Sequence, residues 1–156
     1  MKEYLIDQPA GIIKPASMSS YVWKTAQEGL VIPCHDIIIE YGKGAILLKK
    51  QILWPLGGAI RRGMSAEESL REMVREDCGL ELDSIVELDC ARISADQGAD
   101  TINIRYFAKG RGELRLGPCK KAAVIPPHDY HVRAFREGLH PYVRDFMDMA
   151  VQLISR

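Results

Sequence analysis

The sequence has no excess of charge of either sign. Its 21 lysine and arginine residues are balanced by 21 aspartate and glutamate residues. Tight binding to nucleic acid without regard to sequence requires clustered positive charge. We therefore expect no nucleic-acid partner, while a local basic pocket for one small phosphate ligand remains open.

The sequence also lacks the patterns of membrane-spanning and disulfide-stabilised proteins. No apolar run approaches the length that crosses a membrane, and the N-terminus lacks the basic-then-apolar pattern of a signal peptide. The cysteines are widely spaced and form no CxxC pair, at positions Cys34, Cys78, Cys90 and Cys119. Such spacing is typical of reduced thiols. We expect a cytoplasmic protein with no membrane partner.

What is present fits one compact domain spanning residues 1–156, with 47% hydrophobic and 27% charged residues. Residues 1–33 form a poorly defined N-terminal segment, because prolines 9, 15 and 33 interrupt any long helix there. Pro9-Ala10-Gly11 suggests a turn.

The remaining chain alternates between strand and helix patterns. Strand-like runs cover residues 36–41, 45–50, 85–94 and 101–109. Two weaker strand candidates follow at 113–116 and 122–125. One helix is expected over 65–78 and a second from Pro141, with an apolar stripe that includes Phe146 and Leu153. The order predicts an α/β fold in which a mixed β-sheet packs between helices.

The helix expected over 65–78 has clear start and stop signals. Ser65 and Glu68 form an S-x-x-E capping box, and Gly79 supplies the left-handed residue that ends a helix. At 100° per residue, Leu70 and Val74 fall on its buried side. The helix is therefore expected to present its remaining faces to solvent and to a site.

Three carboxylates crowd one arc of this helix. Glu72 and Glu76 are one turn apart, and Asp77 is adjacent to Glu76. Such groups repel each other unless a cation lies among them, and oxygen-only ligands favour Mg²⁺ or Mn²⁺. The alternatives are a solvated acidic patch and, for Glu72, an i,i+3 ion pair with Arg75.

The segment from Gly57 to Leu80 resembles the Nudix box, whose pattern is GX5EX7REUXEEXGU, with U an aliphatic residue. The matching positions are Gly58, Val74, Glu76, Asp77, Gly79 and Leu80. The resemblance, which extends to the order of elements from about residue 36 to the end, implies a Nudix-like α/β/α sandwich. Three positions depart from the pattern: Met64 stands at the first glutamate, Glu72 at the arginine, and Met73 at the glutamate beside it.

The resemblance implies a metal site and a ligand site. The metal, Mg²⁺ or Mn²⁺, would be held by Gly58 through its carbonyl and by Glu76 and Asp77. Glu72, which stands at the arginine position of the pattern, would join them from the edge of the acidic arc. Met73 replaces a carboxylate that ligates metal in the family, which should weaken one metal position. Methionine at this position is otherwise explained as an extension of the core stripe.

Four basic residues are candidates for binding substrate. Arg61 and Arg62 lie in the loop after the glycines, where guanidinium groups could pair with phosphates or could instead neutralise the acidic helix. Lys50 ends a strand, a common position for lysines on edge strands. Arg105 lies with Asn103 on the polar face of the strand at 101–109.

A general base must activate water for attack on phosphorus or on a sugar carbon. Glu76 is one candidate, and His128 is another by analogy with family members that use a late histidine. Further loop candidates are Asp96, Asp100 and His131.

The function expected from the resemblance is hydrolysis of a nucleoside diphosphate linked to another group, such as a sugar, with a divalent metal. The small ligand would be a nucleotide or nucleotide sugar, and a homodimer is open because many similar proteins dimerise. The alternative is a weak or inactive Nudix-fold module that binds a nucleotide or metabolite, since Met64 and Met73 replace glutamates. A third hypothesis is a structural partner protein without metal affinity.

Overall fold

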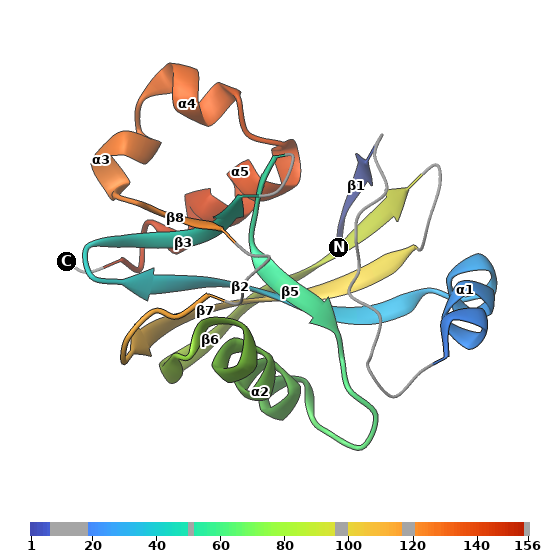
Figure 1. The fold of residues 1–156 in the computed structure, drawn as a ribbon. Helices are drawn as coiled ribbons and strands as arrows, with labels where there is room; N and C mark the ends of the chain where they lie inside the picture. Colours follow the sequence, from blue (N-terminus) through green and yellow to red (C-terminus); the bar gives the residue numbers. More distant parts are fainter. Residues whose placement is uncertain (7–18, 50–51, 96–99, 117–120, 155–156) are drawn as a thin grey trace.

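The computed structural model describes residues 1–6, 19–49, 52–95, 100–116 and 121–154, and it forms an eight-stranded mixed sheet with helices on both faces (Figure 1). The strands are β1 (Lys2–Ile6), β2 (Ile32–Tyr41), β3 (Gly44–Lys49), β4 (Leu53–Trp54), β5 (Leu56–Ala59), β6 (Glu81–Ala95), β7 (Thr101–Arg111) and β8 (Ala122–Ile125). The helices are α1 (Ser20–Gly29), α2 (Ala66–Cys78), α3 (Pro127–Tyr130), α4 (Arg133–Glu137) and α5 (Pro141–Ala150). The expected α/β sandwich with a mixed sheet is confirmed.

Strand β2 is the branching point of the sheet. The main strand order is β1-β6-β7-β2-β3-β4. One edge of β2 pairs in parallel with β7 over nine residues, from Ile32 with Thr101 to Glu40 with Lys109. The other edge is divided between two antiparallel partners, β5 beside its first half and β3 beside its second half. The glycine segment therefore enters the sheet beside its central strand.

The two faces of the sheet support separate core layers, with α2 on one face and α5 on the other (Figure 1). Successive side chains of a strand point to opposite faces, so Ile37 and Ile39 pack on the α2 side and Ile38 packs on the α5 side. Burial on both faces explains the run of three isoleucines at positions 37–39 of this strand.

Most sequence-based expectations for the elements are confirmed, with four corrections, one of which is that β6 begins at Glu81 rather than residue 85. Strand β2 begins at Ile32 rather than residue 36, and residues 113–116, which the structure describes, form no strand. That segment is tied instead to the end of α2, where the Arg115 N–H donates to the Cys78 carbonyl (2.8 Å). Helix α5 begins at Pro141 as expected but ends at Ala150, so Leu153 is 41% exposed and lies outside the buried stripe.

The N-terminal segment contains two elements that the sequence did not predict. Strand β1 pairs in parallel with β6, and α1 begins after Ser19, whose side chain accepts a hydrogen bond from the Val22 N–H. Helix α1 places Trp23 against Ile32 and Cys34 in a small third core cluster. The turn expected at residues 9–11 lies outside the described residues. Among the described residues, no helix is long and apolar enough to span a membrane.

A buried polar group on the α5 side holds the centre of β2. The Asp36 carboxylate accepts hydrogen bonds from Asn103 Nδ2 (2.8 Å) and from the Tyr142 hydroxyl. The Thr101 hydroxyl donates to Asn103 Oδ1 (2.5 Å) and fixes the amide orientation. Burial raises the pKa of Tyr142 well above its ordinary value, and the negative charge of Asp36 adds to this effect. Asn103 and Tyr142 thereby hold the Asp36 carboxylate on the α5-facing side of the sheet.

Arg105, expected to bind substrate, belongs to this same buried face. Its side chain is 0% exposed, and its Nε and Nη2 atoms donate to the two Asp89 carboxylate oxygens, both at 2.5 Å. The guanidinium also lies 5.2 Å from the ring centre of Tyr142 and 5.3 Å from that of Phe146. Burial lowers the pKa of Arg105, but the bonds and charge of Asp89 outweigh it. The expectation of a ligand contact is corrected, because this cation is enclosed by protein.

We predict that Gly57→Ala strongly destabilises the fold whereas Gly58→Ala does not. A Cβ at Gly57 would lie 1.7 Å from Asp36 Oδ1 and 2.6 Å from the His35 carbonyl oxygen, but at Gly58 the nearest contact is Met73 Sδ at 3.9 Å. Urea unfolding should show a loss of about 3 kcal/mol for Gly57→Ala. The matched Gly58→Ala change should stay within about 1 kcal/mol. Equal stability of the two variants would contradict the close approach.

Candidate functional site

The candidate site begins at the glycine strand β5. Gly57 pairs with Asp36 of β2, and Gly58 pairs with His35. Because Gly57 has no side chain, β5 can lie against the Asp36 carboxylate. The Ile60 N–H then donates to the Pro33 carbonyl (3.0 Å), which carries the chain from β5 into the loop before α2.

Helix α2 has the caps that the sequence predicts. The Glu68 N–H donates to Ser65 Oγ (3.2 Å), and the Ser65 N–H donates to Glu68 Oε2 (2.8 Å). Gly79 ends the helix with φ of 69°. Leu70 and Val74 are fully buried against the sheet, so the predicted inner face is confirmed. The helix is therefore fixed in rotation as well as in length.

Arg61 joins the two glutamates on the helix arc. Its Nη1 atom donates to Glu72 Oε2 (2.9 Å) and to Glu76 Oε1 (3.0 Å), while Nη2 donates to Glu76 Oε2 (2.5 Å). These hydrogen bonds raise the pKa of Arg61 above its ordinary value, and the bonds to Glu76 have the larger effect. Of its two expected roles, neutralising the acidic helix is the one this structure contains. Arg75 pairs with Glu81 (2.8 Å), so the ion pair expected between Glu72 and Arg75 is replaced by the one to Arg61.

A buried histidine and serine fix the loop backbone at Arg61, and neither was identified from the sequence. His35 Nε2 and Ser69 Oγ are hydrogen-bonded at 2.9 Å, and Ser69 Oγ also accepts the Arg61 N–H (3.0 Å). His35 and Ser69 are 1% and 0% exposed. The sequence feature that could have indicated this pair is Ser69 itself, a polar residue on the apolar side of α2, one residue before Leu70.

Of the two methionines that depart from the Nudix pattern, Met64 lies in this loop and Met73 lies in α2. Met73 is 7% exposed and packs in the core layer beneath α2, which confirms its expected role as an extension of the apolar stripe. Met64 is half-buried, and its N–H donates to the Arg61 carbonyl (3.3 Å). A thioether is a weak acceptor, so neither position supplies the oxygen that a hard cation prefers.

The described side chains do not form a complete metal site by themselves. Among the described residues, no group of three or more His, Cys, Asp or Glu side chains could hold a metal ion. Glu72 and Glu76 nevertheless contact one common cation, the Arg61 guanidinium. Mg²⁺ is often bound by one or two carboxylates together with substrate phosphates and water. Glu72 and Glu76 could supply the carboxylates, while Gly58 and the half-buried Asp77 remain proposed ligands.

The other predicted site residues are not gathered here. His128 is 81% exposed in α3, where it contacts Asp129 at 3.2 Å, on the face of the sheet opposite α2 (Figure 1). Arg62 is exposed in the loop. Asp100 pairs with Arg92 at 2.5 Å. Two candidates, Lys50 and Asp96, lie outside the described residues.

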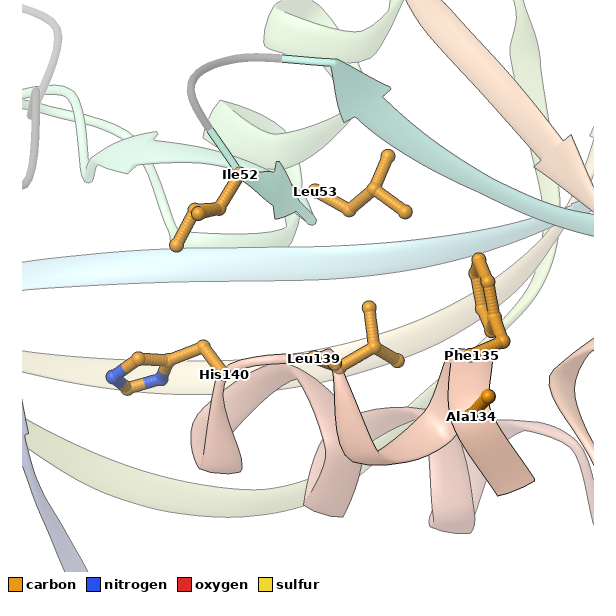
Figure 2. Close-up of a pocket in the computed structure, with 7 residues that line it drawn as sticks. Ile52, Leu53, Ala134, Phe135, Leu139 and His140 are labelled. Carbon is orange, nitrogen blue, oxygen red and sulfur yellow. The ribbon is translucent and has the colours of Figure 1, made fainter. Parts of the chain in front are cut away.

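An open cavity of about 360 Å³, lined by both polar and apolar atoms, lies on the α5 side, where β4 faces α4 and the segment that joins α4 to α5. Figure 2 shows Ile52 and Leu53 on one side of it, facing Phe135, Leu139 and His140. Trp54 lies nearby, stacked on Tyr142 with ring centres 5.2 Å apart. The cavity and the Arg61 ion pairs therefore lie on opposite faces of the sheet, connected through the short strands β4 and β5.

Comparison with known proteins identifies the fold. No family model and no curated protein matches the sequence. Among solved structures, a MutT protein from Bacillus halodurans has 14% identity and a TM-score of 0.65, covering 78% of this chain and 82% of its own. A NUDIX family hydrolase from Clostridium perfringens has 14% identity and a TM-score of 0.62, covering 80% and 99%. A MutT NUDIX hydrolase from Burkholderia pseudomallei has 16% identity and a TM-score of 0.60, covering 76% and 96%. The chain has the Nudix fold, as expected.

We predict that His35 makes the protein less stable as the pH falls below 6.5. Burial lowers the pKa of His35 from 6.5 to about 4, so the folded protein keeps it neutral while the unfolded chain takes up a proton. The stability that neutral His35 contributes is therefore complete above pH 6.5, the pKa in the unfolded chain. It is lost progressively as the pH falls toward about 4, the pKa in the folded protein. Between pH 7 and 5 the loss should be about 2 kcal/mol.

Urea unfolding of the wild type and of His35→Gln at several pH values tests this. Glutamine does not titrate, so the difference in unfolding free energy between the two proteins should narrow by about 2 kcal/mol from pH 7 to 5. A constant difference would show that His35 titrates alike in both states.

Proposed function

We propose that this protein binds a nucleoside diphosphate linked to another group, such as a sugar, beside Gly58 and α2, and hydrolyses it with Mg²⁺ or Mn²⁺. The observation that carries the proposal is that Glu72 and Glu76 turn oxygens toward one cation, at 2.9 and 2.5 Å. A divalent ion bound there would neutralise charge on the diphosphate oxygens. The Nudix fold supports the proposal as an analogy of architecture.

In this proposal, each residue of the site has a chemical role that follows from its position. Glu76 is the more exposed carboxylate, at 59% against 42% for Glu72, and is the candidate to accept the proton of the attacking water. Arg61 and the exposed Arg62 would donate hydrogen bonds to phosphate oxygens, for which the planar guanidinium is suited. Gly58 lets the backbone approach the ligand closely.

We predict that Glu76→Gln lowers hydrolysis of the preferred substrate by about 100-fold or more, because the amide cannot accept the proton. Formation of nucleoside monophosphate and sugar phosphate, or of nucleoside diphosphate and free sugar, should be measured with ADP-ribose and GDP-mannose among a panel of substrates, with Mg²⁺ or Mn²⁺. Glu67→Gln is the matched control, since Glu67 lies on the same helix and pairs with Arg71 (2.7 Å). That control should keep wild-type turnover. Absence of metal-dependent turnover by the wild type across the panel would contradict the hydrolase.

A second candidate function is a nucleotide-binding or metabolite-binding module without turnover. It is favoured by the buried Met73, which replaces a carboxylate of the Nudix pattern, and by Arg61, which already pairs with both glutamates. Such a module would bind the nucleotide but release no product.

Met73→Glu separates these two functions. In a weakened hydrolase the added carboxylate, close to Gly58, should raise metal-dependent turnover, whereas Met73→Gln, of similar size and uncharged, should not. Without metal, Met73→Glu should melt at a lower temperature than Met73→Gln, because it buries a charge. Added Mn²⁺ should restore part of that difference. A binding module predicts no turnover from either variant.

A further inference from the structure

We infer that Arg61 is an exchangeable counter-ion: Glu72 and Glu76 hold it in the ligand-free protein, and the phosphates of the ligand take it over when a divalent metal enters. The inference rests on the proposed function, and it concerns how that site is regulated. Its consequence is that the metal and the phosphate ligand bind together, while either one alone binds weakly.

The geometry makes the guanidinium and a metal ion mutually exclusive. Arg61 Nη1 lies 2.9 Å from Glu72 Oε2 and 3.0 Å from Glu76 Oε1, so this nitrogen fills the space where the two carboxylates converge. A magnesium ion needs oxygens at about 2.0–2.1 Å. The metal therefore cannot join these carboxylates until the arginine side chain leaves.

The side chain can leave without unfolding the site. Arg61 is 34% exposed, and its partners are 42% and 59% exposed. Ion pairs at such exposure are weak and readily exchanged. The Arg61 backbone is held separately, because its N–H donates to the buried Ser69 Oγ (3.0 Å). Only the side chain has to move, from a fixed point on the loop.

A diphosphate is a suitable second partner for the released guanidinium. Arginine has five N–H donors, and three of its hydrogen bonds in this structure go to the two glutamates. Phosphate oxygens accept guanidinium forks in bidentate geometry. The exchange keeps every charge compensated: the metal replaces Arg61 at the carboxylates, and Arg61 faces the phosphates. Such coupling is reciprocal, so metal must also strengthen phosphate binding.

The test measures Mn²⁺ affinity rather than activity. Free Mn²⁺ would be followed by electron paramagnetic resonance in titrations of the wild type, Arg61→Gln and Arg71→Gln, with and without the non-hydrolysable α,β-methylene analogue of ADP. Arg71→Gln is the matched control, because it removes the same charge from a helix residue that bonds Glu67 and the Leu82 carbonyl.

Arg61→Gln should bind Mn²⁺ about tenfold more tightly than the wild type when no nucleotide is present. The analogue should raise the Mn²⁺ affinity of the wild type and of Arg71→Gln by about tenfold, and that of Arg61→Gln much less. Arg61→Lys, a point charge in place of a fork, should give intermediate values and replaces Arg61→Gln if that variant does not fold.

Two results would overturn the exchange: equal Mn²⁺ affinities of the wild type and Arg61→Gln, or a wild-type affinity that the analogue leaves unchanged. These results are separable from failure of the hydrolase. Coupled binding without product release would retain the exchange and reject hydrolysis, whereas turnover without coupling would do the reverse.

Discussion

The close approach of β5 to β2 at Gly57 is the constraint on which the site depends. The Asp36 carboxylate occupies the space that any side chain at position 57 would need, and it is held there by Asn103 and Tyr142. Those two residues come from β7 and α5, on the face of the sheet opposite the ion pairs of Arg61. The α5 side of the protein thus sets the position of the strand that carries the α2-side site. The geometry of the site therefore depends on the packing of the core on the opposite face of the sheet.

The two arginines paired with carboxylates illustrate opposite uses of the same chemistry. Arg105 is fully buried beside Asp89 and three aromatic rings, so loss of Asp89 would leave an uncompensated positive charge in a low-dielectric interior. Arg61 pairs with glutamates in partial contact with water, where an ion pair is worth about 1 kcal/mol or less. The first pair is consequently fixed in the fold. In the proposed exchange, the second pair breaks when a divalent metal binds the glutamates and the phosphates bind Arg61.

The sequence predicted best those features that depend on neighbours along the chain. The caps of α2 and its inner face follow from residues three and four positions apart, and they are found as expected. Arg105 was misassigned because alternation separates the two faces of a strand without showing that both are covered by helices. The contacts of Arg61 with Glu72 and Glu76, 11 and 15 residues away, depend on how the loop folds back over the helix. The His35–Ser69 pair, 34 residues apart, requires the sheet itself.

The replacement of carboxylate by Met73 and the presence of Arg61 change the charge of the site in the same direction. The first removes a negative charge beside Gly58, and the second adds a positive charge between Glu72 and Glu76. Glu72, Glu76 and Arg61 together carry about one net negative charge, and a free divalent cation would have to displace Arg61 to reach the two carboxylates. Phosphate oxygens supply both the missing charge and the missing coordination. Under the proposed function, a site of this composition would favour a metal–diphosphate complex over the free metal. Met73 and Arg61, which would weaken a resident metal site, would then make the site selective for metal that arrives with its ligand.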